Sequence, residues 1–302
     1  MPDDVFVLAF DHRQSLLSSF FGVEAEPTPT EAADARLLKR ITWGGLRTAI
    51  SGGLPVERAG ALVDPTYGRD VIEEARDLGV RFAIPVEESG RDEFAFEVRD
   101  WRERLDALDP AWAKVLVRYH PGRDAAMNAR QRDALREVSA RCSETGRGFM
   151  VELLIPPTPD DLAAVAGDRS RYDREIRPAH VVDAMRELQA AGVEPAVWKL
   201  EGLERTEDCA AVAEVARLGG RTDVGCVVLG RGADLEAVER WLRVAATAEG
   251  FVGFAVGRTI WWDPMRSFFG TGASEEAADA ASSEIARRYR GLVDVFTTAR
   301  GR

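Results

Sequence analysis

Eight short apolar runs, separated by longer segments of helical periodicity, constrain the fold of this 302-residue chain more than any other feature. Short continuous apolar runs are typical of strands buried on both faces of a parallel sheet. The runs are residues 5–10, 59–63, 82–86, 115–117 with its flanks, 149–154, 196–199, 225–229 and 251–256. Apolar spacings of three and four predict helices over residues 31–51, 69–78, 125–145, 179–191, 207–218, 234–248 and 274–299.

Strands that alternate with helices over this length predict a single (β/α)8 barrel, expected over residues 1–302. An open, doubly wound parallel sheet is the alternative, because the number of strands does not show closure. Two polar segments that contain proline, 24–30 and 156–177, follow expected strands. In a barrel both belong to the C-terminal face, where loops build active sites, although the sequence leaves the role of 156–177 open.

Composition narrows the class of protein. The formal charge of −11 disfavours nucleic acid as a partner, because phosphate backbones attract basic faces. No apolar run is long enough to span a bilayer, and the acidic start Met-Pro-Asp-Asp is unlike a basic secretory signal. Three scattered cysteines fit a reducing compartment. We therefore expect a soluble cytoplasmic enzyme with a small-molecule substrate, and a homo-oligomer is compatible with the sequence.

Lysine is rare here: three lysines, Lys39, Lys114 and Lys199, stand against 37 arginines. Codon composition explains such a bias, so the positions of the remaining lysines carry the information. Lys199 ends an expected strand of a covered sheet. Burial disfavours the charged ammonium, so we expect a partly neutral amine, as Schiff-base chemistry on a carbonyl requires. Alternatively, Lys199 points to solvent at the strand edge or forms a structural salt bridge.

Lys114 opens another expected strand, Lys114-Val-Leu-Val-Arg-Tyr-His120. Period-two alternation places Lys114, Leu116 and Arg118 on one face of it. If that face points into the barrel, Lys114 and Lys199 can be neighbours, and their like charge further disfavours protonation of one of them. The alternative places Lys114 at the exposed bottom of the barrel.

Glu152 lies within the apolar run 149–154, where a carboxylate needs a partner or a raised pKa. Lys114, Glu152 and Lys199 thus fall on three consecutive expected strands. Two amines and a carboxylate form a plausible nucleophile and proton-transfer set. A purely structural ion pair would give the same pattern, but the coincidence of three consecutive strands favours catalysis.

Glycines follow the last two expected strands, in Leu229-Gly-Arg-Gly-Ala-Asp234 and Val256-Gly-Arg-Thr-Ile-Trp-Trp262. Phosphate sites of such barrels often form from these two loops. Glycine lets the backbone approach a phosphate closely, and arginine can donate charge-assisted hydrogen bonds to it, so the two loops predict a phosphate site. Glycine is, however, also common in plain turns. Its residues are Gly230, Arg231, Gly232, Gly257 and Arg258.

The remaining polar candidates are less specific. Asp11, at the end of the first run, could orient a substrate hydroxyl or cap the next segment. His12 and His120 could reach the same rim of the barrel as Asp11. No two of the three histidines have a metal-binding spacing, and His180 lies in an expected helix, so we expect neither a metal nor a cofactor. Cys226 is expected to be a small core residue.

Several segments are specific enough to compare with known families: Leu8-Ala-Phe-Asp-His-Arg13, Lys114-Val-Leu-Val-Arg-Tyr119, Phe149-Met-Val-Glu-Leu-Leu154, Val197-Trp-Lys199 and Gly257-Arg-Thr-Ile-Trp261. Over nearly the whole chain they resemble the class I tagatose-1,6-bisphosphate aldolase family. The segment Val197-Trp-Lys-Leu-Glu-Gly202 is still more similar to the aldolase-like domain fused to 5-dehydro-2-deoxygluconokinase in inositol catabolism. The resemblance implies a metal-free barrel that cleaves a phosphorylated ketose-like substrate and releases dihydroxyacetone phosphate.

The same resemblance implies roles for single residues. Lys199 matches the Schiff-base lysine, Glu152 the acid/base carboxylate and Lys114 the accompanying lysine. Asp11 matches a substrate-contacting aspartate, and Gly257 with Arg258 matches the phosphate-binding turn. The turn Leu229-Gly-Arg-Gly232 departs from the Leu-Ser-Ala-Gly of the tagatose enzymes, which leaves the phosphate contact and the substrate open.

The expected substrate is 6-phospho-5-dehydro-2-deoxy-D-gluconate, split into dihydroxyacetone phosphate and malonate semialdehyde. Tagatose 1,6-bisphosphate or a sulfo-sugar phosphate is the alternative within the class. A barrel that only binds sugar phosphates, and a metal-dependent lyase, are alternatives from other classes.

Overall fold

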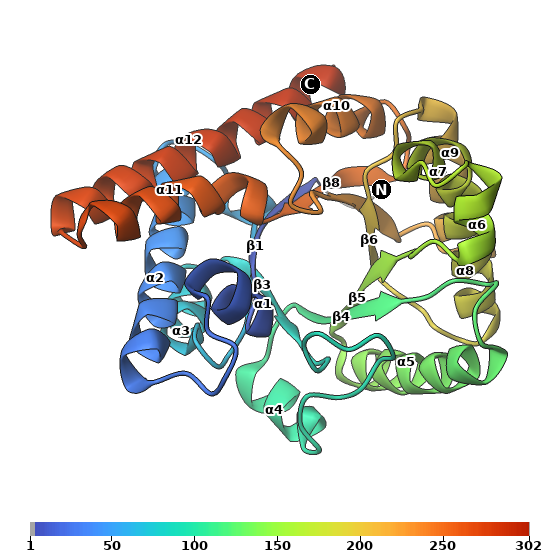
Figure 1. The fold of residues 1–302 in the computed structure, drawn as a ribbon, viewed down its shortest axis with the longest axis horizontal. Coiled ribbons are helices and arrows are strands. Elements are labelled where there is room, and N and C mark those ends of the chain that lie inside the picture. Colours follow the sequence, from blue (N-terminus) through green and yellow to red (C-terminus); the bar gives the residue numbers. More distant parts are fainter. Residues whose placement is uncertain (1–3, 302) are drawn as a thin grey trace.

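A computed structural model describes residues 4–301 of the chain. Eight parallel strands follow one another in sequence order around a closed barrel, which confirms the (β/α)8 fold and excludes the open sheet. Figure 1 shows the strands at the centre and the helices around them. The strands are β1 (Val5–Phe10), β2 (Ala59–Val63), β3 (Arg81–Pro85), β4 (Trp112–Arg118), β5 (Gly148–Leu154), β6 (Val197–Glu201), β7 (Gly225–Leu229) and β8 (Phe251–Val256). The ends of the expected domain, 1–3 and 302, lie outside the described residues.

The seven expected helices are all present, with ends that differ by a few residues: α2 (Pro29–Ser51), α3 (Arg69–Asp77), α5 (Ala125–Thr145), α8 (Arg177–Ala190), α9 (Thr206–Arg217), α10 (Leu235–Ala246) and α12 (Glu275–Ala299). Others were not expected: α1 (Gln14–Leu16), the π-helix η1 (Leu17–Phe21), the 3₁₀-helix η2 (Val56–Arg58), α4 (Trp101–Leu108), α6 (Pro159–Ala164), α7 (Arg169–Glu175) and α11 (Arg258–Thr271).

The segment 156–177, expected as a polar loop, is largely helical. Thr158 and Asp161 form a capping box that starts α6, and Asp168 caps the start of α7. Each helix is only one or two turns long, too short for an apolar period to show in the sequence. The side-chain caps therefore decide this local structure.

The inner face of the barrel is divided along its axis. Val5, Val7 and Ala9 of β1 point inward and pack with inward residues of the other strands near their N-terminal ends. Toward the C-terminal ends the inward positions become charged, as with Lys114 on β4 and Glu152 on β5. The apolar plug closes the bottom of the barrel, so the charged groups can be reached only from the C-terminal end.

Other expectations concern single residues. Gly146, just past α5, has φ +69° and ends that helix in the left-handed conformation. Cys226 is fully buried in the core between sheet and helices. Among residues 4–301, none of the helices combines the length and apolarity that a membrane crossing requires.

Candidate active site

All three lysines of the chain are buried: Lys39 is 0% exposed, and Lys114 and Lys199 are each 2% exposed. Lys114 and Lys199 lie inside the barrel, which excludes the alternatives of a solvent-facing Lys199 and an exposed Lys114. Glu152 joins the two amines, because its Oε2 atom lies 2.9 Å from each Nζ. The three consecutive strands therefore bring these side chains together as expected.

Lys114 is surrounded by carboxylates. Besides Glu152, its Nζ contacts Asp11 Oδ2 at 2.9 Å and Glu87 Oε1 at 2.7 Å. Burial opposes the charge of Lys114, but these three carboxylates outweigh it and raise its pKa well above the ordinary value. Lys114 is consequently a fixed cation, not a second nucleophile.

The pKa values of the three carboxylates around Lys114 are not all shifted in the same direction. Burial opposes ionisation of Asp11 and Glu152, yet the ammonium groups of Lys114 and Lys199 prevail and lower both pKa values. For Glu87 burial prevails over Lys114 and raises the pKa. The site thus holds two carboxylates whose pKa values are lowered and a third whose pKa is raised.

Glu87 was missed by the sequence analysis. It follows β3 just beyond Pro85, in a segment whose side-chain directions no periodicity fixes. Its Oε2 atom is buried and accepts no hydrogen bond from the described residues, and Arg13 donates to its backbone oxygen at 2.7 Å. Glu87 is therefore a further candidate for holding a proton near Lys114.

Lys39 was also missed, because it lies in the expected helix 31–51, far from any strand. Its ammonium donates to the backbone oxygens of Phe10 and His12, which flank Asp11, and pairs with Asp64 at 2.7 Å. Three acceptors around a compact ammonium suit lysine better than the planar arginine fork. Lys39 thus fixes the backbone that carries Asp11.

A cavity of about 450 Å³ opens above these groups, and Asp11, Lys114, Glu152 and Lys199 line it. His12 lines it too, and its pKa is lowered to about 3, mainly by burial. It is therefore a neutral hydrogen-bonding group at neutral pH.

The loops after β7 and β8 form one side of this cavity through Gly232, Gly257 and Arg258. The sequence treated Gly257-Arg258 as a turn, but it is the start of α11, whose N-terminus carries no side-chain cap. The N-terminus of α10 is capped by Asp234, which accepts from Ala237 N. The uncapped N-terminus is the one suited to an anion.

Two residues of the expected phosphate site are placed differently. Arg231 lines the cavity but is committed to carboxylates, Asp173 at 2.9 Å and Glu201 at 3.0 Å. Gly230 is not among the lining residues, and a Cβ there would meet Val256 at 2.9 Å. Gly230 thus serves close packing, while Gly232, Gly257 and Arg258 remain on the cavity.

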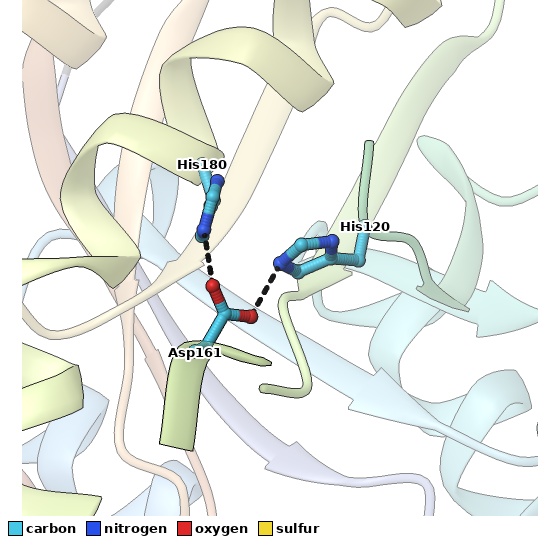
Figure 2. Close-up of side chains that lie close together, drawn as sticks. All are labelled: His120, Asp161 and His180. Carbon is cyan, nitrogen blue, oxygen red and sulfur yellow. Dashed lines mark hydrogen bonds and ion pairs between the residues drawn. The ribbon is translucent and has the colours of Figure 1, made fainter. Parts of the chain in front are cut away.

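The structure brings His120 and His180 together around Asp161, a proximity that the sequence spacing did not indicate (Figure 2). His120 Nε2 lies 3.0 Å and His180 Nε2 2.9 Å from the carboxylate, so His120 does not share the rim with His12. The three residues are close enough to hold a metal ion. However, His120 Nδ1 accepts from Gly122 N, which leaves the proton on Nε2 instead of a free lone pair. The contacts fit a hydrogen-bonded tie between β4, α6 and α8 better than a metal site.

We expect Asp161→Asn to loosen this tie. Asp161 accepts from Thr158 in the capping box, contacts His180 at 2.9 Å and lies 3.0 Å from His120, so its replacement weakens the reciprocal half of the capping box and both histidine contacts. Limited proteolysis should then cut within 156–177 faster than in the parent protein. An unchanged cleavage rate contradicts the assignment.

The stabilising contribution of the Asp161 contacts should also depend on pH. Burial opposes ionisation of Asp161, but hydrogen bonds from Thr158 and His180 lower its pKa to about 2. Its stabilising contribution is therefore complete above about pH 4, where the unfolded carboxyl is ionised, and is lost as the pH falls toward about 2. Proteolysis of the parent protein should accelerate in that window, and Asp161→Asn should flatten the response.

Residues 1–300 match the model of a family described as an uncharacterized protein conserved in bacteria, DUF2090. The chain belongs to this family. The DUF2090 chain is also similar to the following solved structures, two of which are described as aldolases. Fructose-bisphosphate aldolase from Plasmodium falciparum has 15% identity and a TM-score of 0.65, over 98% of this chain and 90% of that one. A Schiff-base-forming fructose-1,6-bisphosphate aldolase has 14% identity and a TM-score of 0.57, over 97% and 94%. Cgl0159 from Corynebacterium glutamicum has 19% identity and a TM-score of 0.56, over 94% and 86%. At these identities the likeness shows the shared barrel fold.

Proposed function

We propose that this DUF2090 protein is a class I aldolase that forms a Schiff base through Lys199. One observation carries the proposal: the Lys199 amine lies buried beside the cavity, 2.9 Å from a carboxylate oxygen that a second ammonium, Lys114, contacts at the same distance. A buried amine whose proton has an adjacent acceptor is what attack on a ketone needs. A fixed cation on the other side keeps that acceptor in place.

The residues suggest the following chemistry. The Lys199 ammonium first gives a proton to Glu152, and the resulting neutral amine attacks the ketone carbon. Glu152 then returns the proton as water leaves, which gives an iminium that bonds Nζ to that carbon. A carboxylate takes the proton of the hydroxyl on the second carbon from the iminium carbon, and the bond between that carbon and the intervening carbon breaks. The electron pair of this bond moves toward the iminium and forms an enamine. The aldehyde fragment leaves. Protonation of the enamine and addition of water then release the ketone and restore the amine.

Glu152 is the proposed proton carrier, because its Oε2 atom is the one in reach of Lys199. Asp11, ionised and held by Lys114, is placed to contact a substrate hydroxyl. Lys114 keeps its charge throughout.

For the substrate we propose 6-phospho-5-dehydro-2-deoxy-D-gluconate, with dihydroxyacetone phosphate and malonate semialdehyde as products. The phosphate would lie at the N-terminus of α11, held by Arg258 and the backbone at Gly232 and Gly257. This follows the resemblance to the aldolase-like domain of inositol catabolism. Tagatose 1,6-bisphosphate or a sulfo-sugar phosphate is the runner-up. A cytoplasmic location and a homo-oligomer stay predictions.

A barrel that only binds a sugar phosphate is the second candidate. The uncapped N-terminus of α11 beside Arg258 favours it, because this anion site needs no catalytic amine. A binding protein, however, gains nothing from Lys199 buried next to an ionised carboxylate, and burial of such charges is costly.

Borohydride reduction in the presence of dihydroxyacetone phosphate tests the proposal. We expect a covalent adduct on Lys199, located by peptide mass spectrometry, and no adduct without the ketone. A panel of phosphorylated ketoses then identifies the substrate by turnover. Thermal stabilisation by the ketone with neither adduct nor turnover would instead support the binding protein.

A further inference from the structure

The arginines around the cavity differ in whether a carboxylate neutralises them. Three form ion pairs, and two have no carboxylate within ion-pair distance among residues 4–301. The paired ones are Arg13, Arg91 and Arg231, and the unpaired ones are Arg118 and Arg258. Arg258 is the proposed phosphate ligand. Arg118 has no role yet.

Nearby carboxylates do not neutralise Arg118, because other arginines hold them. On the loop after β3, Glu88 pairs with Arg91 at 2.9 Å, Asp92 with Arg123, and Glu93 with an arginine of α5 at 2.7 Å. The acidic loop over the cavity is thus matched by its own cations. The guanidinium of Arg118 therefore remains available to a ligand.

Arg118 is also held in position. Its Nη1 donates to the backbone oxygen of Arg91 at 2.7 Å, and Gln131 Nε2 donates to the Arg118 backbone oxygen at 3.2 Å. The first contact orients the guanidinium and the second holds the backbone of Arg118, while most of the five N–H donors stay open to a ligand. A guanidinium fixed in this way loses little conformational freedom when it binds an anion.

The barrel places the two unpaired arginines across the site from each other. Arg118 ends β4 and Arg258 follows β8, and these strands are four apart in the closed ring of eight. β6, which carries Lys199, lies two strands from each. Along β4, Arg118 lies about 13 Å nearer the mouth than Lys114, at roughly 3.3 Å per residue. A ligand that reaches both arginines must therefore cross above Lys199.

We propose that Arg118 binds a second anionic group of the substrate, at the end remote from the phosphate. The inference rests on the proposed aldolase function and names the substrate class: a ketose phosphate whose aldehyde fragment carries a carboxylate or phosphate. The ketone of the substrate then lies at Lys199, between an anion site at Arg118 and another at Arg258 on the opposite side of the barrel. Arg118 is a specificity-determining residue that binds the anionic group of the aldehyde fragment.

Synthesis assays separate this role from catalysis. Dihydroxyacetone phosphate is combined with malonate semialdehyde, glyceraldehyde 3-phosphate or neutral propionaldehyde. In Arg118→Met we expect kcat/KM to fall about 10- to 100-fold for a charged aldehyde, the cost of one charge-assisted contact, and to change less than about two-fold for propionaldehyde. Which of the two charged aldehydes loses more identifies the anion as carboxylate or phosphate.

The matched control is Arg136→Met, which removes an exposed arginine of α5 that is paired with Asp133, does not line the cavity and should leave all rates unchanged. Borohydride trapping by dihydroxyacetone phosphate should be equal in both variants and the parent protein, because this ketone does not reach Arg118. Equal losses for charged and neutral aldehydes overturn the Arg118 assignment while trapping persists. Absence of trapping in the parent protein overturns the aldolase proposal as well.

Discussion

Replacing Lys199 by methionine is expected to lower aldol cleavage by at least about 10³-fold and to abolish borohydride trapping. The substitution removes the amine that forms the covalent intermediate, and no nearby group can replace it. Lys114 cannot, because three carboxylates keep its ammonium charged. Turnover of the identified ketose and mass spectrometry of the reduced protein measure the two effects.

The Lys199→Met variant should still fold. Glu152 keeps Lys114 as a partner at 2.9 Å after Lys199 is lost, so no carboxylate is left without a cation. The thermal midpoint should therefore move little, and a loss of activity then reports on chemistry. Substantial turnover in a folded Lys199→Met protein, or an adduct at another residue, contradicts the Schiff-base assignment.

Replacing Lys114 by methionine is expected to have the largest effect on stability. Asp11 and Glu87 lose the cation with which each forms its ion pair, and Glu152 keeps Lys199 alone, inside a site where Lys114 is 2% exposed. Breaking a buried ion pair from one side costs about 3–5 kcal/mol, because charges remain without compensation. Urea unfolding at pH 7 should show a loss of that order.

The deficit of Lys114→Met should shrink on acidification. In the parent protein Asp11 and Glu152 have lowered pKa values, so they add stability above their unfolded pKa values and lose it as the pH falls through the folded ones. Without Lys114, Lys199 is the one ammonium left to oppose the burial of Asp11 and Glu152, so their folded pKa values rise and the folded variant takes up protons between about pH 7 and about pH 4. The two unfolding free energies should therefore converge toward about pH 4.

Arg136→Met is the control for this experiment. Arg136 forms a solvent-exposed pair with Asp133 at 2.9 Å on α5, so its loss should cost less than about 1 kcal/mol. A Lys114→Met deficit as small as that of the control, or one that does not change with pH, would contradict the buried carboxylate cluster.

The fold could be read from the chain because its signals are local. Apolar runs and helical periods depend on neighbouring residues, and they placed every strand and each of the longer helices except α11, whose glycine start resembled a turn. Short helices such as α6 were not predicted, because side-chain caps and not periodicity start them.

The core of the site could be anticipated for a similar reason. Strand alternation put Lys114 and Arg118 on one face, and strand order put Glu152 between the two lysines. Glu87 and Lys39 could not be anticipated: one follows a proline outside any period, and the other reaches the site from the far end of a helix. Both depend on contacts between residues distant in sequence.

The sequence by itself determined the alternating strands and helices, the rarity of lysine and the shared strand face of Lys114 and Arg118. Only the tertiary structure decided which groups meet: that Lys114 serves three carboxylates, that Arg231 is already paired, and that Arg118 faces Arg258 across Lys199. The physical reason is that periodicity fixes the direction of a side chain, whereas closure of the barrel fixes its distance from every other strand.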